Sequence, residues 1–379
     1  MTHESRAAEW SAQPSMTVKG IYNSNLLLTP FPHQDVWGHS ELPSVAFSGK
    51  TERLDVTGKA GAEFVNYYGG QDQSLTNLFF PLSVHYKTEQ DALGFDGSFV
   101  RDNTLMSELL TTGLALRFTQ RNHWTANPTW THAVTERLAF QAGYQFSDVT
   151  YEDAVRFGLV DFQVHGGTAG LQYQATEHDQ LQLTAVYTNF HTTNSTTPLR
   201  VNYPGAVASF THSFSETLTG TISGGPRFVT TELQSSTTTS QSHQTVWLFG
   251  GTLQKQFDSG TVLLNANRDV YPSGFGALIQ TDRVGVTLSK NLTETTGVSA
   301  EAQFYKVSGV STSGQGINFP ENRLVYLTPR AFWKFSEWWK VEVSYTHIRR
   351  EADNFSQAAL SHAGVITLTY FPPKLATSK

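Results

Sequence analysis

The feature that most constrains the fold is the strict alternation of apolar and polar residues over strand-length segments. In RLAFQAGYQFSDVTY, residues 137–151, Phe140 and Tyr144 fall on one face, and Gln141 and Gln145 fall on the other. Residues two apart share a face of a β-strand, so this segment predicts a strand with one apolar and one polar face. Such a strand suits a half-buried sheet of a soluble sandwich. It equally suits a membrane barrel, whose outer face meets lipid and whose inner face meets water.

Eight short turns recur along the chain, and seven of them carry glutamate at the tip. Successive turn centres lie 35 to 47 residues apart, which suits one hairpin plus a longer connection at its far end. The far connections are long, polar and varied, such as LTPFPHQDVWGHSE, HTTNSTTPLRVNYPG, LQSSTTTSQSHQ and VSTSGQGINFPEN. Short turns at one end and long loops at the other are typical of outer-membrane barrels. The short turns are KTERL at 50–54, KTEQD at 87–91, VTERL at 134–138, ATEHD at 175–179, FSETL at 214–218, FDSGT at 257–261, LTETT at 292–296 and FSEWW at 335–339.

These turns also give a strand count. Eight turns join sixteen strands, and TVKGIYNSNLLL and HAGVITLTYF add one strand at each end, which makes eighteen. An even number, with both termini at the short-turn end, is the rule for bacterial barrels. The sequence therefore predicts an all-β fold, a transmembrane antiparallel up-and-down β-barrel of about eighteen strands. We expect a polar N-terminal extension at 1–16, the barrel at 17–372 and a C-terminal tail at 373–379.

Two soluble folds share parts of this pattern. A β-propeller repeats at a similar period, but its blades carry internal signatures that we do not find in this sequence. A sandwich also has alternating strands, although eighteen strands with one regular hairpin period favour a barrel.

Composition agrees with a wet but weakly charged surface. Charged residues make up 15% of the chain, well below the roughly 25% that is usual for soluble domains. The absence of cysteine excludes disulfides and thiolate ligands, and no basic tract points to nucleic acid. The first residues, MTHESRAAEWSAQPSM, contain no apolar core of a signal peptide. We therefore expect a mature form, without its signal peptide, in the bacterial outer membrane, with outer-membrane lipid and lipopolysaccharide as partners.

Several segments resemble a known family. GIYNSNLLLTP, the repeated strand-TER-strand hairpins, YQFSDVTYED and GLVDFQVHGGTAGLQYQATE are similar to the putative β-barrel porin family of bacterial outer membranes. Some members of that family accompany exopolysaccharide export genes. The resemblance covers most of residues 17–372 and implies the barrel fold and the outer-membrane location. It implies no catalytic residue.

A search for chemistry finds no enzyme motif. HExxH, GxSxG, GxGxxG and GxxxxGK[ST] are all missing. Most of the thirteen histidines lie in loops or near strand ends, which favours solvated or interfacial imidazoles over metal ligands. Barrel hydrolases use a Ser/His pair on the outer face, and Ser147 and His165 would need one particular register to form such a pair. We therefore expect no enzyme activity, no cofactor and no metal.

Alternation also predicts which polar residues line the lumen. Both signs of charge occur among them, which fits a water-filled channel with a transverse field, or a wall braced by internal salt bridges. Barrels of 16 to 18 strands are wide enough for an aqueous lumen, so we favour the channel. The expected lining residues are Lys59, Glu63, Asp96, Arg117, Gln141, Gln145, Arg227, Asn265, Asn267, Asp269, Arg283, Glu301, Arg323, Lys340 and Glu342.

The longest candidate connection, RDNTLMSELLTTGLALRFTQRNH at 101–123, contains one plausible helical turn around MSELL. We expect residues 103–122 to fold inward and narrow the channel, held by lumen carboxylates such as Glu301 and Glu342.

Two functions remain open at this point. We favour passive passage of small hydrophilic or saccharide solutes through a porin-like channel. The alternative is a plugged structural or export barrel that works with a periplasmic polysaccharide-export partner. In either case we expect the glutamate-tipped turns to be periplasmic and the SSTTTSQS segment around Thr237 to be external.

Overall fold

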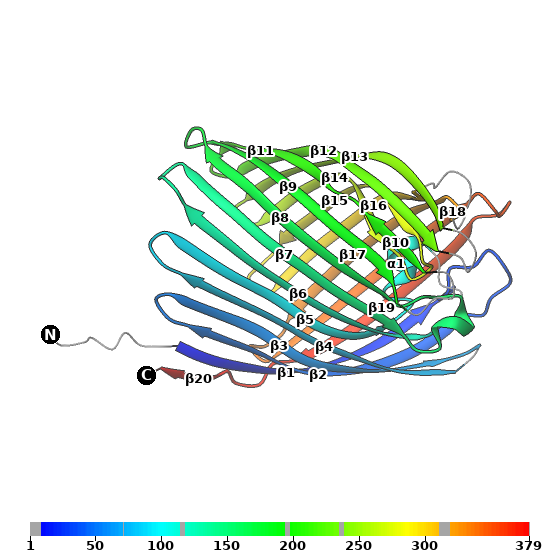
Figure 1. Ribbon diagram of the computed structural model, residues 1–379. Helices are drawn as coiled ribbons and strands as arrows, with labels where there is room; N and C mark the ends of the chain where they lie inside the picture. The colour runs from blue at the N-terminus through cyan, green and yellow to red at the C-terminus, as the bar shows by residue number, and fades with distance from the viewer. Residues whose placement is uncertain are drawn as a thin grey trace.

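A computed structural model describes residues 9–70, 72–113, 118–193, 198–234, 239–310 and 319–378. The strands form one closed antiparallel sheet (Figure 1). Each strand up to β19 pairs with the next along the chain, except that β10 and β11 do not pair with each other. β1 closes the barrel against β19, with Ile21 opposite Val365. The strands are β1 (Glu9–Asn23), β2 (Val36–Lys50), β3 (Leu54–Tyr68), β4 (Gln73–Lys87), β5 (Asp91–Asn103), β6 (Gln120–Ala133), β7 (Leu138–Tyr151), β8 (Phe162–Gln174), β9 (Asp179–Thr192), β10 (Leu199–Asn202), β11 (Gly205–Ser215), β12 (Leu218–Gln234), β13 (Thr239–Phe257), β14 (Gly260–Pro272), β15 (Leu278–Asn291), β16 (Thr296–Gly309), β17 (Asn322–Lys334), β18 (Trp339–Ala352), β19 (Ala359–Tyr370) and β20 (Leu375–Ser378).

Two interruptions reconcile this list with the strand count from the sequence. β10 and β11 both pair with β9 and with β12, so they are one strand broken at Tyr203 and Pro204. β20 continues the line of β19 along the first residues of β1. Across the described residues the wall therefore has eighteen strands, and the predicted all-β up-and-down barrel is confirmed. Residues 9–16 lie in β1 and 375–378 in β20, so strand pairing extends into both segments expected as tails.

The eight predicted short turns all join neighbouring strands at one end of the barrel, where the described chain also begins and ends (Figure 1). Five of the eight share a threonine at the second position, which explains much of their similarity. In KTERL the Thr51 hydroxyl accepts the backbone N–H of Leu54 at 3.0 Å. Thr135 does the same for Leu138, and Thr176 for Asp179, each at 3.0 Å. A hydroxyl that accepts a backbone donor three residues on fixes a tight turn, so this end of the barrel stays short.

The opposite end carries the longer connections, and we call it the loop end. One expectation there is wrong. In LQSSTTTSQSHQ, strand β12 runs to Gln234 and β13 starts at Thr239, so most of this segment is wall. Thr237 itself lies outside the described residues. Two short helices also occur at this end, α1 (Glu108–Thr112) and η1 (Ala154–Phe157). No described helix has the length and hydropathy to span a bilayer.

The outer surface of the barrel is apolar. Tyr144 on the apolar face of β7 is 46% exposed, whereas Ser147 and Val149 on the opposite face are buried. Leu183, Ile222, Leu264, Val284 and Ile366 are further exposed apolar residues of the outer face. Trp130, Trp333 and Trp339 are exposed near the short turns, and Trp37 and Trp124 are exposed near the loop end. An apolar band flanked by aromatic girdles is the surface that a bilayer solvates.

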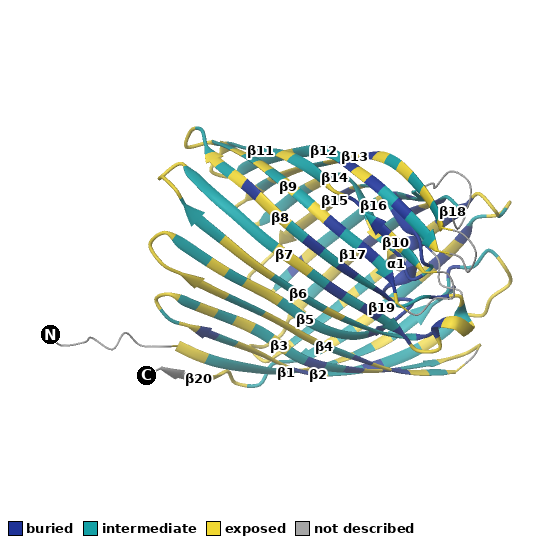
Figure 2. Ribbon diagram, viewed as in Figure 1, coloured by how far each residue is buried: buried dark blue, intermediate teal, exposed yellow. Residues whose placement is uncertain are grey.

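Burial is uneven along the barrel axis. Figure 2 shows buried residues gathered toward the loop end, while the short-turn end is mostly intermediate or exposed. The buried apolar residues there form two clusters inside the barrel. A lumen filled with water along its whole length would leave these side chains wet. The loop end must therefore be partly filled by protein.

Candidate functional site: the lumen and its internal loop

The connection between β5 and β6 folds into the barrel, as predicted. Figure 1 shows α1 within the barrel near the loop end. The connection is closed at its base by a hydrogen bond from Thr104 N–H to the Thr119 carbonyl at 3.0 Å. Gly113 ends the helix in the left-handed region, with φ at 74°. A Cβ at Gly113 would lie 2.9 Å from Leu324 Cδ1, so this glycine is needed for conformation and for space.

The contacts of α1 reach the opposite wall. Leu105 and Leu109 are buried in one cluster with Ile279 on β15, Val307 on β16 and Leu324 on β17. Since the connection leaves the sheet between β5 and β6, it crosses the lumen to make these contacts. We call this group the α1 cluster, which consists of Leu28, Leu105, Leu109, Ile279, Tyr305, Val307, Phe319, Leu324 and Ala359.

A second apolar group covers the inner wall from β7 to β15 at the same end. It includes Ala154 of η1 and Phe190, which is 0% exposed. Phe275, in the connection between β14 and β15, packs against this group and against the α1 cluster. The two groups together narrow the loop end from both sides. The members of the second group are Val149, Tyr151, Ala154, Leu159, Phe162, Val164, Phe190, Val201, Tyr203, Val229, Val246 and Leu278.

One polar contact ties α1 to the wall. The Tyr151 hydroxyl donates to Oε1 of Glu108 at 2.5 Å, and Glu108 is 3% exposed. Oε2 of Glu108 is buried without a hydrogen-bond partner among the described residues. Burial raises the pKa of the Glu108 carboxyl, although the Tyr151 hydroxyl and the charge of Arg121 act in the opposite direction. The helix is therefore held partly by a carboxyl group that prefers its neutral form.

The expected anchors of the loop are elsewhere. Glu301 pairs with Arg330 at 3.4 Å, and Glu342 with Lys340 at 2.7 Å, both toward the short-turn half of their strands. They brace the wall and do not hold α1. The prediction that lumen carboxylates hold the loop through these two residues is wrong, because the loop reaches β15–β17 near their other ends. Apolar contacts and Tyr151 hold it instead.

A chain of paired polar groups lines the inner wall from β1 to β6. Lys19 Nζ lies 2.6 Å from Glu63 Oε1, and Ser40 donates to the same oxygen at 3.0 Å. Asp102 and Arg121 form a two-pronged ion pair at 2.9 and 2.7 Å. Arginine and carboxylate in this geometry make strong charge-assisted hydrogen bonds. This side of the lumen is polar but its charges are mostly neutralised in pairs.

The structure places most predicted lining residues on the inner face, as judged from the exposed apolar residues that alternate with them. Gln141 hydrogen-bonds to the amides of Gln172 and Gln182, at 2.5 and 2.9 Å, which forms an amide row across three strands. Arg117 lies outside the described residues. The inner-face residues are Lys59, Glu63, Asp96, Gln141, Gln145, Arg227, Asn265, Asn267, Asp269, Arg283, Glu301, Lys340 and Glu342.

Arg323 is a correction, because its side chain lies on the outer face. It alternates with Leu324, which is 0% exposed in the α1 cluster, and shares its face with exposed Val325. Its guanidinium pairs with Glu321 at 2.8 Å, and Lys306 pairs with the same carboxylate at 2.6 Å. Alternation misleads here because the inner face of β17 is itself apolar where it meets α1. Polarity alone then no longer marks the lumen side.

Several inner-face groups were missed from the sequence. Lys19, Asp102, Arg121 and Arg350 face the lumen, and each could have been found by extending the alternation of its strand from an exposed aromatic residue such as Trp124 or Tyr345. The burial of Glu108 had no such signal, since α1 is five residues long.

The enzyme hypothesis gains no support from the geometry. Ser147 points inward and lies 2.8 Å from His123 Nε2, whereas His165 points outward and contacts Tyr144 at 2.6 Å. The Ser147–His165 pair considered from the sequence is therefore not formed. Over the described part of the chain, no group of three or more His, Cys, Asp or Glu side chains is arranged to hold a metal.

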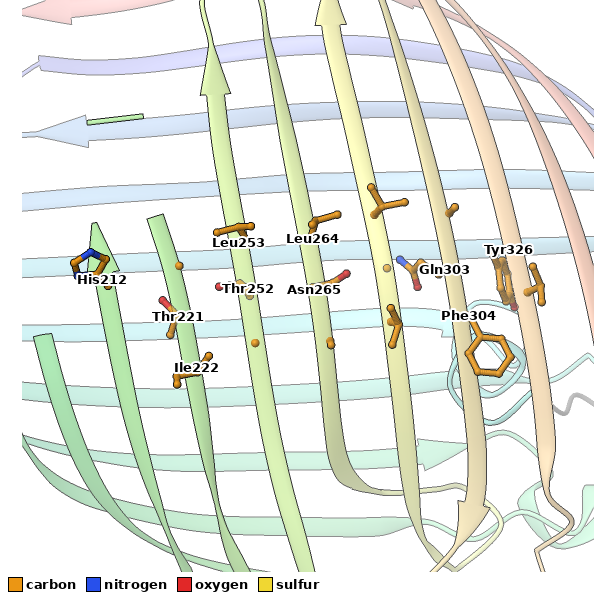
Figure 3. A pocket seen from close by; sticks show the side chains of 18 of the residues that line it. His212, Thr221, Ile222, Thr252, Leu253, Leu264, Asn265, Gln303, Phe304 and Tyr326 are labelled. Carbon is orange, nitrogen blue, oxygen red and sulfur yellow. The ribbon is translucent and has the colours of Figure 1, made fainter. Parts of the chain in front are cut away.

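A hollow of about 900 Å³ lies over strands β11–β17 (Figure 3). Leu253, Leu264 and Phe304 contribute outward-facing side chains, while Asn265 of the same wall faces the lumen. Small outward residues such as Gly251 leave the space. The outward-facing part of this lining is mostly apolar, with His212 at its edge, and is suited to acyl chains.

Comparison with protein-family models and with curated proteins gives no match. Among solved structures the chain is similar to OccK5 of Pseudomonas aeruginosa, with 12% identity, 96% of this chain and 98% of that chain covered, and a TM-score of 0.44. It is also similar to OccAB4 of Acinetobacter baumannii, with 10% identity, 97% and 98% coverage and a TM-score of 0.46. It is similar as well to OccK7 of P. aeruginosa, with 7% identity, 96% of this chain and 99% of that chain covered, and a TM-score of 0.48. The fold assignment rests on the strand pairing of the chain itself.

Proposed function

We propose that the protein is a porin-like channel of the bacterial outer membrane that lets small hydrophilic or saccharide solutes pass passively. The observation that carries the proposal is the closed eighteen-stranded wall, apolar outside and polar inside, with a loop folded into its lumen. A wall of this size encloses more cross-section than side chains can fill. The internal loop then sets the width of the remaining passage.

The chemistry of the inner wall suits neutral polar solutes. Gln141, Gln172 and Gln182 present amide donors and acceptors in one row. Ser98 and Thr125 pair through their hydroxyls at 2.7 Å on the inner face of β5 and β6. Such groups exchange hydrogen bonds with sugar hydroxyls at little cost, since each can bond to a neighbour or to a passing solute.

The membrane assignment rests on the outer face. Outer-membrane barrels have an even strand number, short periplasmic turns and an apolar band between aromatic girdles. The resemblance of GIYNSNLLLTP and of the TER hairpins to the putative β-barrel porin family points the same way. We therefore propose that outer-membrane lipid and lipopolysaccharide surround the barrel and that the glutamate-tipped turns are periplasmic.

A second candidate function follows from the two apolar groups at the loop end. They cover much of the inner wall there, which also suits a barrel that is closed at rest and works with a periplasmic polysaccharide-export component. A closed barrel and a narrow channel share a fold but differ in conduction.

The test is a conductance record in a planar bilayer. Purified protein is refolded in lipid, and a variant with residues 104–119 replaced by a short Gly/Ser linker is recorded beside it. We expect single-channel steps from the intact protein and larger steps from the variant. A silent intact protein with a conducting variant would favour the closed barrel. Silence from both, with the barrel folded by circular dichroism, would contradict the channel.

A further inference from the structure

Three arginines on one side of the lumen carry charges that no carboxylate neutralises. Arg227 on β12, Arg283 on β15 and Arg350 on β18 all lie on the inner face, and we call them the arginine wall. Among the described residues none of the three makes an ion pair within 4.0 Å. Arg121 on β6 differs from these three arginines, because it forms a bidentate ion pair with Asp102.

Two of the three arginines are also incompletely hydrogen-bonded to neutral groups. Arg350 donates to Asn322 Oδ1 and to the Leu28 carbonyl, both at 3.1 Å. Arg227 is 8% exposed, and its Nη1 has no hydrogen-bond partner in the part of the chain that the structure describes. Nε of Arg283 is likewise buried without a partner from the described ranges. A guanidinium stays charged at any ordinary pH, and a buried charge without a counter-charge is costly.

Among the described residues one carboxylate, Asp269, acts on the arginine wall, and it is already engaged. Asp269 Oδ2 accepts hydrogen bonds from Asn267 and from the Tyr271 hydroxyl, the latter at 3.2 Å. It acts electrostatically on Arg227 without forming an ion pair. The pairs Glu301–Arg330 and Lys340–Glu342 cancel, so one carboxylate against three guanidinium groups leaves the described part of this wall with an excess of two positive charges.

The arginine wall borders the narrow part of the lumen. The Arg283 guanidinium lies 5.2 Å from the centre of the Tyr305 ring, and Tyr305 belongs to the α1 cluster. The Tyr305 and Tyr326 rings stack at 5.3 Å, and Tyr326 lies within the electrostatic reach of both Arg283 and Arg350. Arg283 is half-buried, so it retains surface toward the lumen, whereas Arg227 acts from within the wall.

We propose that Arg283, supported by the charges of Arg227 and Arg350, binds the carboxylate of a small anionic solute, such as a sugar acid, beside the α1 cluster. The inference rests on the proposed channel and adds a substrate class to it. A guanidinium that only braced the wall would be expected to have a carboxylate neighbour, as Arg121 and Arg268 do. A carboxylate from the solute supplies the missing counter-charge through charge-assisted hydrogen bonds.

The first test measures binding and does not require conduction. Gluconate is titrated calorimetrically into detergent-solubilised, folded protein, with glucose as the neutral counterpart. We expect gluconate to bind and glucose to bind at least about tenfold more weakly, since charge-assisted hydrogen bonds are the stronger kind. Arg283→Gln and Arg227→Gln should each weaken gluconate binding by about tenfold or more.

The matched control is Arg268→Gln. Arg268 lies on β14, next to Asp269, but points outward and is paired with Asp282 at 2.5 Å. Its loss should leave gluconate binding unchanged. Equal binding of gluconate and glucose, no gluconate binding at all, or an equal loss in the Arg268 control would each overturn the site. If Arg227→Gln fails to fold, the half-buried Arg283 still decides the question.

Conductance separates this inference from the channel itself. In a potassium chloride gradient we expect the chloride-to-potassium permeability ratio to exceed one and to fall by about twofold or more in Arg283→Gln, because fixed charges in a lumen concentrate counter-ions. A conducting protein with the same ratio in both arginine variants would overturn the arginine wall and leave the channel intact. Gluconate binding that needs Arg283 in a protein that never conducts would support the site and contradict the channel.

Discussion

Replacing Tyr151 by phenylalanine tests whether its contact with Glu108 holds α1 in the lumen. The hydroxyl donates to Oε1 of Glu108 at 2.5 Å. Oε2 has no hydrogen-bond partner within the described residues, and Glu108 is 3% exposed, so water has little access to the group. The phenyl ring would keep its apolar contacts in the second cluster. The substitution therefore removes the hydrogen bond to Glu108 and the contact of the hydroxyl with Arg121, and it leaves the packing in place.

The magnitude follows from the burial of Glu108. Leaving a buried acceptor unsatisfied costs about 1–3 kcal/mol, which changes an equilibrium between two positions of the loop by about 5- to 150-fold. The barrel wall should keep its stability, because strand pairing is untouched. The fraction of time spent in a wider conducting level should rise by a factor in that range.

Single-channel recording at constant pH measures that fraction, with Tyr187→Phe as the control. Tyr187 loses a comparable hydrogen bond, to Asn202 Oδ1 at 2.9 Å, but lies on the outer face. We expect the control to behave as the unaltered protein. The reasoning is refuted if Tyr151→Phe shows the same level occupancy as the control while its barrel is folded.

Three further predictions concern pH, facing and orientation. Burial raises the pKa of Glu108, so the loop packed in the lumen binds a proton more readily than the released loop. The packed position should therefore lose stability, and the occupancy of the wider conducting level should rise, as pH increases through that raised pKa. Glu108→Gln should remove this pH dependence, and an unchanged dependence would contradict the prediction. Leu264→Arg should lower the free energy of unfolding in lipid by roughly 2–4 kcal/mol near the midplane, and Asn265→Arg should lower it far less. Denaturant titration in vesicles measures both values, and the reverse order would mean that the two faces are assigned the wrong way round. If the loop end is external, a cysteine at Val155, which is 77% exposed in η1, should react with an impermeant maleimide on intact cells, and a cysteine at Glu136 in a short turn should not. Equal labelling of the two would contradict this orientation.

The short-turn half of the barrel is readable from the sequence because three independent signals agree there. The Thr51 type of turn repeats, the alternation is strict, and the inner face is wet. Under those conditions a polar residue opposite an apolar one must face the lumen. Gln141, Glu301 and Lys340 were placed by this reasoning, and the structure puts them on the inner face.

The loop half is less readable because its inner face touches protein. Phe162 and Val164 on β8, and Leu324 on β17, point inward and are buried by the internal loops. At this end the polarity of the faces is inverted, because polar Gln163, His165 and Arg323 face outward while their apolar neighbours face inward. Arg323 was misplaced for that reason. The helix near MSELL was anticipated, but its contacts across the lumen depend on the closed barrel and leave no pattern in the local sequence.

The charge balance of the lumen depends on register, which alternation does not supply. The dipeptides Arg268–Asp269 and Asp282–Arg283 each place one charge outside and one inside. The observed register sets Arg268 opposite Asp282 on the outer face, and Arg283 opposite Asn267 on the inner face. Asp269 is two residues farther along β14, a distance of about 7 Å. A shift by two residues would keep every side chain on its own face, but would set Asp269 opposite Arg283 and neutralise it. The unpaired charge of Arg283 thus follows from the register that gives the outer face its ion pair.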